Sequence, residues 1–322
     1  MDDNNLSVGE TGSDQPGMVW IPGGEFRMGS DEHYPEEKPS HRVRVDGFWM
    51  DIGPVTNRQF DRFVASTGHV TFAEIAPMLQ DYPGASEEML QPGSMVFTPP
   101  PGPVPHDVRH WWSFVFGANW RQPLGPGSGI EGLEDHPVVH VGIDDVRAYA
   151  AWSGKQVPTE AEWEFAALGG RGGTEFAWGN ELTPDGQHMA NTWQGLFPWQ
   201  NLEEDGYVRT SPVGAYPANG YGLLDMIGNV WEWTDDWFTN RHPDDAAKPC
   251  CVPRNPQGGR RETSIDPGQQ DVGRMVLKGG SHLCAPSYCR RYRPAARHPH
   301  PVDTTTSHIG FRCIVRPRSS TT

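Results

Sequence analysis

The stretches Gly228-Asn-Val-Trp-Glu-Trp-Thr234 and Gly310-Phe-Arg-Cys313 combine glycine with large aromatic side chains, as does much of this 322-residue chain. Glycine (38) and proline (31) are too frequent for a helical protein, and tryptophan occurs 13 times. This composition predicts an α+β domain of short elements and many turns, fixed by aromatic side chains. No repeat or linker divides the chain, so we expect a single compact domain, low in regular secondary structure.

Charge and hydropathy limit the possible partners. The formal net charge of −15 argues against nucleic acid, which needs a basic face. It suits a cationic peptide substrate, and equally an acidic surface that keeps the protein soluble. The mean hydropathy is −0.62, and no apolar run approaches the ~20 residues that span a bilayer. The chain starts without a secretory signal, so we expect a cytoplasmic monomer with no membrane partner.

Tails and helices follow from local signals. Residues 1–17 are expected to be a disordered acidic tail, residues 18–317 the domain and residues 318–322 a second tail. Thr56 with Gln59, and Thr159 with Glu162, form capping boxes that start two helices, and Gly68 ends the first. Another helix is predicted over 144–152. Short strands are expected within 18–29, 41–45, 275–278 and 309–315, whereas 76–129 and most of the remaining C-terminal half should be irregular.

The cysteines need separate interpretations. Five is an odd number in a chain expected to be cytosolic, so a disulfide framework is unfavourable. Cys284 and Cys289 lie five positions apart, and their spacing alone leaves a metal or redox site and a disulfide or unrelated thiols equally open. Thiolates select Cu(I) or zinc. Adjacent Cys250 and Cys251 would chelate one tetrahedral ion poorly, which favours copper over zinc.

Four stretches together resemble the formylglycine-generating enzyme, or sulfatase-modifying factor, family. They are 18–29, 136–170, 178–237 and 276–315, and they include Val157-Pro-Thr-Glu-Ala-Glu-Trp-Glu164, Gly279-Gly-Ser-His-Leu-Cys284 and Ser287-Tyr-Cys-Arg-Arg-Tyr-Arg293. The two stretches quoted first are shared by a broad superfamily, so they indicate only a fold related to C-type lectin domains. The cysteine pair after Gly279-Gly-Ser indicates activity. Ala150 and Pro294 stand where vertebrate members have cysteine, which leaves Cys313 unpaired and suggests a reduced, bacterial-type enzyme.

The resemblance implies a copper-dependent oxidase. Cys284 and Cys289 would bind Cu(I), and the cysteine of a sulfatase segment of pattern Cys-x-Pro-x-Arg would add a third sulfur. Oxygen would then oxidise the substrate Cβ, and a thioaldehyde would hydrolyse to Cα-formylglycine. Ser281 could hydrogen-bond oxygen or water as a further catalytic residue. Tyr288 could wall the pocket, although packing accounts for it at least as well.

The resemblance also implies two structural calcium sites, because calcium takes six to eight oxygens from carboxylates and carbonyls. The first set is Asn191, Thr192, Asp205 and Tyr207, and the second is Asp225, Gly228, Val230 and Glu232. Ordinary turn formation is the alternative for these residue types.

Four histidines fall in suggestive patterns. We interpret His106 and His110 as solvated or packing residues, since no third ligand is evident. His298 and His300 are expected at the surface. Two other functions compete with an oxidase. An inactive, lectin-like peptide-binding module would have lost one or both cysteines of the pair, and a non-haem iron sulfoxide synthase would need a helical domain that this chain lacks.

Overall fold

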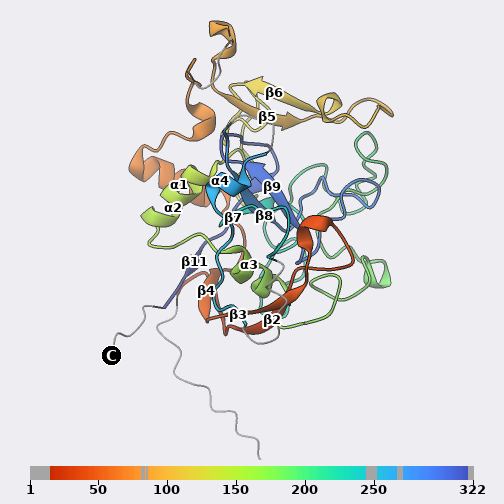
Figure 1. The fold of residues 1–322 in the computed structure, drawn as a ribbon. Coiled ribbons are helices and arrows are strands. Elements are labelled where there is room, and N and C mark those ends of the chain that lie inside the picture. The colour runs from red at the N-terminus through yellow and green to blue at the C-terminus, as the bar shows by residue number, and fades with distance from the viewer. Residues whose placement is uncertain (1–14, 81–83, 85, 244–251, 267–270, 318–322) are drawn as a thin grey trace, which may run out of the picture.

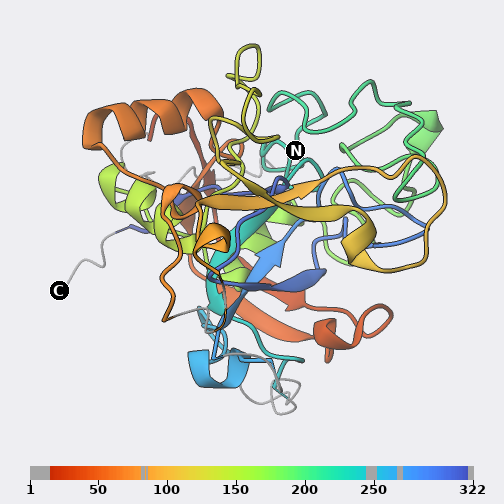
Figure 2. The ribbon, with the colours of Figure 1, turned by 90° about the horizontal axis from the view of Figure 1, so that it is seen from above.

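The computed structural model describes residues 15–80, 84, 86–243, 252–266 and 271–317, so the predicted tails lie almost wholly outside the described residues. Helices α1 and α2 lie against one side of the domain, the β5–β6 ribbon lies across the top and β2–β3 lies at the bottom (Figures 1 and 2). The helices are α1 (Asn57–Thr67), α2 (Ile143–Trp152), α3 (Glu160–Ala167) and α4 (Arg261–Ser264). Single 3-10 turns occupy Pro35–Glu37, Phe72–Glu74, Glu87–Met89, Val108–His110 and Pro184–Gly186.

The strands form four small sheets in the described part of the chain. A three-stranded sheet has the order β1-β4-β11, a four-stranded sheet has the order β10-β7-β8-β9, and β2-β3 and β5-β6 are two-stranded. Their bounds are β1 (Met18–Ile21), β2 (Gly24–Met28), β3 (His41–Val45), β4 (Phe48–Asp51), β5 (Gly93–Phe97), β6 (Trp112–Phe116), β7 (Trp231–Trp237), β8 (Arg274–Lys278), β9 (Arg297–Pro301), β10 (Ile309–Gly310) and β11 (Ile314–Val315).

The predicted helices are confirmed together with their caps. Thr56 accepts a hydrogen bond from the Gln59 amide, the Gln59 side chain returns one to the Thr56 amide, and Gly68 ends α1 in the left-handed conformation. Thr159 and Glu162 make the same capping box at α3. These signals are local, so the sequence alone was sufficient to place them.

Three segments that we expected to be irregular form strands. β7 has its first four residues buried, without the polar–apolar alternation that marks a half-exposed strand. β5 and β6 pair as a hairpin inside the 76–129 segment. β9 contains Pro299 and Pro301, and it occupies an edge of its sheet, where a strand tolerates residues without an amide proton.

Helix α3 is buried along its whole length, and the carboxylates of Glu160 and Glu164, which lie on one face of the helix, are neutralised inside the core. The Lys278 ammonium lies 2.8 Å from a Glu164 oxygen, and Arg297 donates to Glu160 at 2.8 Å. Lys278 is the last residue of β8 and Arg297 is the first residue of β9. Because a buried charge without its partner is costly, these pairs fix the connection between the two strands, residues 279–296, against α3.

Candidate active site

The two cysteines of the pair lie on the connection after β8, and two glycines shape its start. Gly279 and Gly280 have φ values of 92° and 73°, which other residues rarely adopt. A Cβ at Gly279 would lie 2.9 Å from the Met226 carbonyl oxygen. The Cys284 amide then donates to the Ser281 carbonyl and the Cys289 amide to the Ala285 carbonyl, each at 2.9 Å. Two successive turns therefore bring the cysteines together.

The sulfur atoms of Cys284 and Cys289 are 3.2 Å apart and are not bonded covalently. Only 2% of Cys284 and 9% of Cys289 is exposed. Burial raises the pKa of Cys284. The hydrogen bond from Cys284 lowers the pKa of Cys289, and Arg291 acts in the same direction. Arg291 therefore favours the thiolate form of Cys289, the sulfur that it contacts. The short distance between the sulfurs argues against two unrelated thiols, and a metal or redox site stays a prediction.

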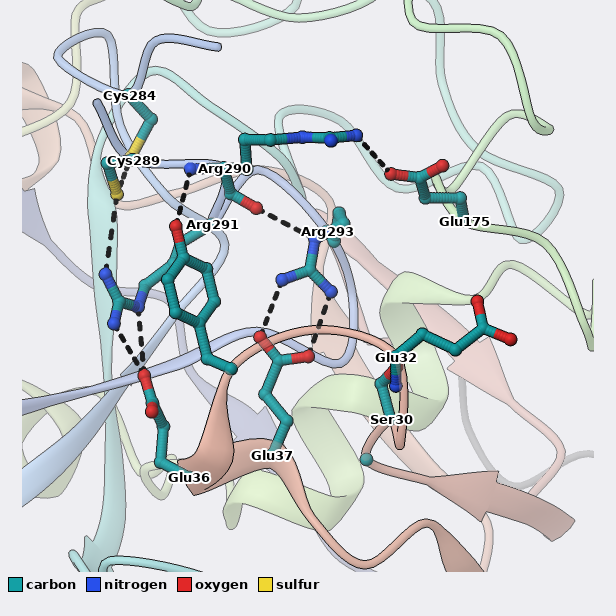
Figure 3. A network of polar contacts seen from close by, with 12 residues as sticks. Ser30, Glu32, Glu36, Glu37, Glu175, Cys284, Cys289, Arg290, Arg291 and Arg293 are labelled. Atoms are coloured by element: carbon teal, nitrogen blue, oxygen red, sulfur yellow. Dashed lines mark hydrogen bonds and ion pairs between the residues drawn. The ribbon is translucent and has the colours of Figure 1, made fainter. Parts of the chain in front are cut away.

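Arg291 is a site residue that our sequence analysis did not single out. Its guanidinium donates to the Cys289 sulfur at 3.9 Å and to a Glu36 oxygen at 2.6 Å (Figure 3). Arginine within Ser287-Tyr-Cys-Arg-Arg-Tyr-Arg293 was visible in the sequence, but Glu36 lies 255 positions away and carried no signal.

Aromatic side chains cover the cysteine pair on another side. The ring of Tyr288 stacks on Phe197 with centroids 4.1 Å apart, and Trp111 meets both rings edge-on. Exposed His106 lies 5.2 Å from the Tyr288 ring, which agrees with a packing histidine, whereas exposed His110 ends a separate 3-10 turn. Tyr288 is thus packed among aromatic rings, which agrees with its interpretation as a packing residue, and its role as the wall of a pocket stays a prediction.

Ser281 is fully buried within the first cysteine turn. Its hydroxyl oxygen accepts a hydrogen bond from the Leu283 amide at 3.2 Å. This contact gives Ser281 a structural role in the turn, and the catalytic role implied by the resemblance stays a prediction.

The first predicted calcium set is partly engaged within the protein. Asp205 accepts hydrogen bonds from the Tyr207 amide and the Tyr216 hydroxyl, both at 3.0 Å. Asn191 uses its amide nitrogen to reach the Arg209 carbonyl, and the Thr192 carbonyl accepts from Gln194. Both Asp205 oxygens therefore already accept one hydrogen bond each, and each keeps a second lone pair. The Asp205 carboxylate and the Asn191 amide oxygen are donor types that calcium prefers, and calcium at this set stays a prediction.

The second set fits less well. One Asp225 oxygen is buried without a hydrogen-bond partner, as an oxygen that faces a cation would be. Glu232, however, receives two hydrogen bonds of 2.7 Å from Arg312 and one of 2.8 Å from the Trp163 indole. Arg312 therefore already neutralises Glu232. The carbonyls of Gly228 and Val230 lie in the same segment as Asp225 and Glu232. Calcium at either set stays a prediction.

The prediction that His298 and His300 lie at the surface is wrong for His300, which is buried, whereas His298 is half-buried. They belong to β9, where His298 stacks on Trp231 and His300 meets Trp233 edge-on. Burial lowers the pKa of His298 to about 3 and that of His300 to about 4. The Arg-His-Pro-His-Pro stretch falls in the part of the chain expected to be irregular, whereas it forms a strand that brings both rings against β7.

Cys313 lies apart from the pair in the hydrogen-bond pattern. It is a fully buried free thiol whose backbone pairs with Asp51. Cys250 and Cys251 lie outside the described residues. A separate cavity of about 910 Å³ opens between β2, α3 and Arg293, and its lining includes neither Cys284 nor Cys289. This cavity is therefore distinct from the dithiol.

The fold and the buried dithiol define a compact, C-type-lectin-like domain of the formylglycine-generating-enzyme kind. Residues 5–317 match the sulfatase-modifying factor enzyme 1-like domain, and the chain belongs to that family. It is 53% identical to the formylglycine-generating enzyme of Mycobacterium tuberculosis, over 94% of this chain and 98% of that protein. Identity to the mouse formylglycine-generating enzyme is 44%, over 92% of this chain and 74% of that protein.

Solved structures support the fold. The structure of PvdO from Pseudomonas aeruginosa matches with a TM-score of 0.61 and 22% identity, covering 95% of this chain and all of that one. The expectation of a single α+β domain low in regular structure is confirmed. In the described part of the chain, no helix is long and apolar enough to cross a membrane.

Proposed function

We propose that this chain oxidises the cysteine of a Cys-x-Pro-x-Arg segment in a sulfatase polypeptide to Cα-formylglycine, with O₂ as the oxidant and Cu(I) held by Cys284 and Cys289. The observation that carries this proposal is the pair of buried free thiols, 3.2 Å apart, in a chain 53% identical to a formylglycine-generating enzyme. We also propose that the protein acts as a cytoplasmic monomer.

The donor set suits Cu(I). Two thiol sulfurs are soft ligands, and their burial removes competing water. Among the described residues, no three His, Cys, Asp or Glu side chains are grouped to hold a metal. Copper at Cys284 and Cys289 would therefore receive two side-chain ligands of this kind. A coordination position would remain for the substrate sulfur. Bound copper would supply the redox chemistry that lets O₂ react with the substrate cysteine.

The surrounding residues prepare the pair for this role. The hydrogen bonds from Cys284 and Arg291 lower the pKa of Cys289, which favours the thiolate that a soft metal ion binds. Tyr288 and its stacked partner Phe197 exclude water from one side. Ser281 holds the turn that carries Cys284.

The test is turnover of a Cys-x-Pro-x-Arg peptide by the reduced full chain, measured by mass spectrometry. We expect conversion to the aldehyde only when copper, O₂ and a thiol reductant are all present. Omission of each component in turn is the control. Conversion that is indifferent to copper and oxygen would contradict the proposed chemistry. Peptide binding without conversion under all conditions would favour the inactive, lectin-like module.

A further inference from the structure

The Arg291 side chain contacts the sulfur of Cys289 and connects it to the N-terminal part of the chain. One guanidinium nitrogen donates to the Cys289 sulfur at 3.9 Å. Two other nitrogens donate to the same Glu36 oxygen, at 2.6 and 3.2 Å (Figure 3). Because the guanidinium is planar and rigid, the contact with Glu36 fixes the direction of the donor toward the sulfur.

Tyr34 completes the anchorage of this arginine. The Arg291 guanidinium carbon lies 3.8 Å from the centre of the Tyr34 ring, a cation–π contact. The Tyr34 hydroxyl accepts a hydrogen bond from the Arg290 amide at 3.1 Å. The Arg291 and Glu36 side chains are only 19% and 15% exposed. Arg291 is therefore held from two directions, with little freedom to follow a moving sulfur.

The contact between Arg291 and Cys289 favours the open form of the pair. A disulfide would require the sulfurs to approach from 3.2 Å to about 2.05 Å. Cys289 lies between Cys284 and the Arg291 guanidinium (Figure 3), so this approach lengthens the bond from Arg291, whereas the open dithiol retains it. The open dithiol is the form that can bind a soft metal.

We propose that Arg291, anchored by Tyr34 and Glu36, is a positioning residue that keeps Cys284 and Cys289 in the open dithiol form and opposes their closure to a disulfide. This role rests on the proposed function in assigning the pair to catalysis. Closure removes two electrons and two protons from the pair. With glutathione disulfide as the oxidant, its sulfur–sulfur bond breaks and takes up these electrons and protons. Two molecules of reduced glutathione are released as the new sulfur–sulfur bond between Cys284 and Cys289 forms.

The experiment measures this exchange equilibrium in the metal-free full chain. The protein is equilibrated anaerobically with mixtures of reduced and oxidised glutathione, quenched with acid, alkylated and mapped by mass spectrometry. We expect Arg291→Gln to shift the equilibrium toward the disulfide about tenfold, because it removes a charge-assisted hydrogen bond. For this two-electron exchange, tenfold corresponds to about 30 mV. Arg291→Lys should shift it nearly as far, since one ammonium cannot replace the fork that joins Glu36 to the sulfur.

Two further variants separate positioning from general damage. Glu36→Gln leaves Arg291 in place but weakens its anchor, so a shift of about threefold is expected. Arg290→Gln is the matched control, because Arg290 is the neighbouring residue and pairs with Glu175 without touching either sulfur. Its equilibrium should stay within twofold of the wild type. Thermal unfolding shows whether each variant is folded. If Arg291→Gln is not folded, the result for Glu36→Gln decides.

This role is overturned if the equilibrium of Arg291→Gln stays within twofold of the wild type. If Arg291→Gln is unfolded, the same criterion applies to Glu36→Gln. An equal shift in Arg290→Gln would also overturn it. The proposed function fails by a different result, namely peptide conversion in variants that lack Cys284 or Cys289. The two failures are therefore distinguishable.

Discussion

Glu37 and Arg293 form a bidentate ion pair in the interior, with nitrogen–oxygen distances of 2.6 and 2.9 Å. Neither side chain is more than 1% exposed. The pair joins the first 3-10 turn to the segment that follows Cys289, so the N-terminal and C-terminal parts of the chain share one buried contact (Figure 3).

Removal of one partner of this pair should destabilise the fold strongly. Glu37→Ala leaves the Arg293 guanidinium buried and unpaired, and we expect the free energy of unfolding to fall by about 3–5 kcal/mol. Urea denaturation followed by tryptophan fluorescence measures it. The control is Glu25→Ala, which breaks an exposed pair with Arg42 and should cost less than about 1 kcal/mol. Equal losses in the two variants would contradict the importance of burial.

The cysteines should divide sharply by function. Cys284→Ser and Cys289→Ser should each abolish tight Cu(I) binding and peptide conversion, because one sulfur cannot hold the ion alone. Cys313→Ala should keep conversion within a few-fold, since the hydrogen bonds of Cys313 are to Asp51 of β4 and do not involve the pair. Chelator competition measures copper affinity, and mass spectrometry measures conversion. An active Cys289→Ser enzyme together with an inactive Cys313→Ala enzyme would show that the site is misplaced.

Peptide variants test the proposed substrate pattern. Replacement of the peptide cysteine by serine should prevent conversion, because a hydroxyl is a poor Cu(I) ligand. Replacement of its arginine by lysine should raise KM, because several planar donors are lost while the charge is kept. Initial rates over a range of peptide concentrations give both values. Conversion of the serine peptide at the rate of the cysteine peptide would exclude sulfur ligation.

Calcium should act on stability more than on catalysis. If calcium binds at Asp205, a chelator should lower the melting temperature of the wild type, because loss of a ligand of the folded state removes stabilisation by linkage. Asp205→Ala should be less stable and should not respond to the chelator. Glu232→Ala should be destabilised whether or not calcium is present, because Arg312 loses its partner. A wild type that is indifferent to the chelator and contains no calcium would refute both sites.

Acid should destabilise the protein through its buried histidines. Burial lowers the pKa of His140 and His300 to about 4 and that of His298 to about 3, against about 6.5 in the unfolded chain. The unfolded state therefore binds more protons below pH 6.5. Each of these histidines should reduce stability by about 1.4 kcal/mol per pH unit between about pH 6.5 and 4.

Denaturant unfolding at pH 7.5, 6.5 and 5.5 tests the effect of acid. The wild type should lose little stability in the first step and much more in the second. His300→Gln removes one titrating group, so its stability should fall less steeply below pH 6.5, whatever its stability at pH 7.5. A wild type whose stability is constant down to pH 5.5, or an unchanged slope in His300→Gln, would show that these histidines do not bind protons on unfolding.

What could be predicted from the sequence was determined by neighbours in the chain. The capping boxes at Thr56 and Thr159 involve residues three positions apart, so the sequence displays both partners. The cysteine pair likewise lies within one loop. The contact between Arg291 and Glu36 was not predictable in this way, because only the folded chain brings the two residues together.

The missed strands have a different cause. β7 is buried on both faces at its start, so its sequence lacks the alternation that identifies a strand. β9 carries prolines that normally argue against a strand, and its pairing with β8 depends on residues 19 to 27 positions earlier. Because β9 was missed, the positions of His298 and His300 were not predicted either. The sheet determines how far a side chain on a strand is buried, whatever its residue type.

The prolines of β9 also affect how the molecule meets its own copies. β9 pairs with β8 on one side and ends the four-stranded sheet on the other. Pro299 and Pro301 alternate with His298 and His300 along it, so the amide protons available for the β8 ladder come from the histidines. The outward side of the strand then lacks donors where the prolines stand. An edge strand with so few outward amide protons is a poor template for an added strand, which disfavours edge-to-edge aggregation of the folded protein.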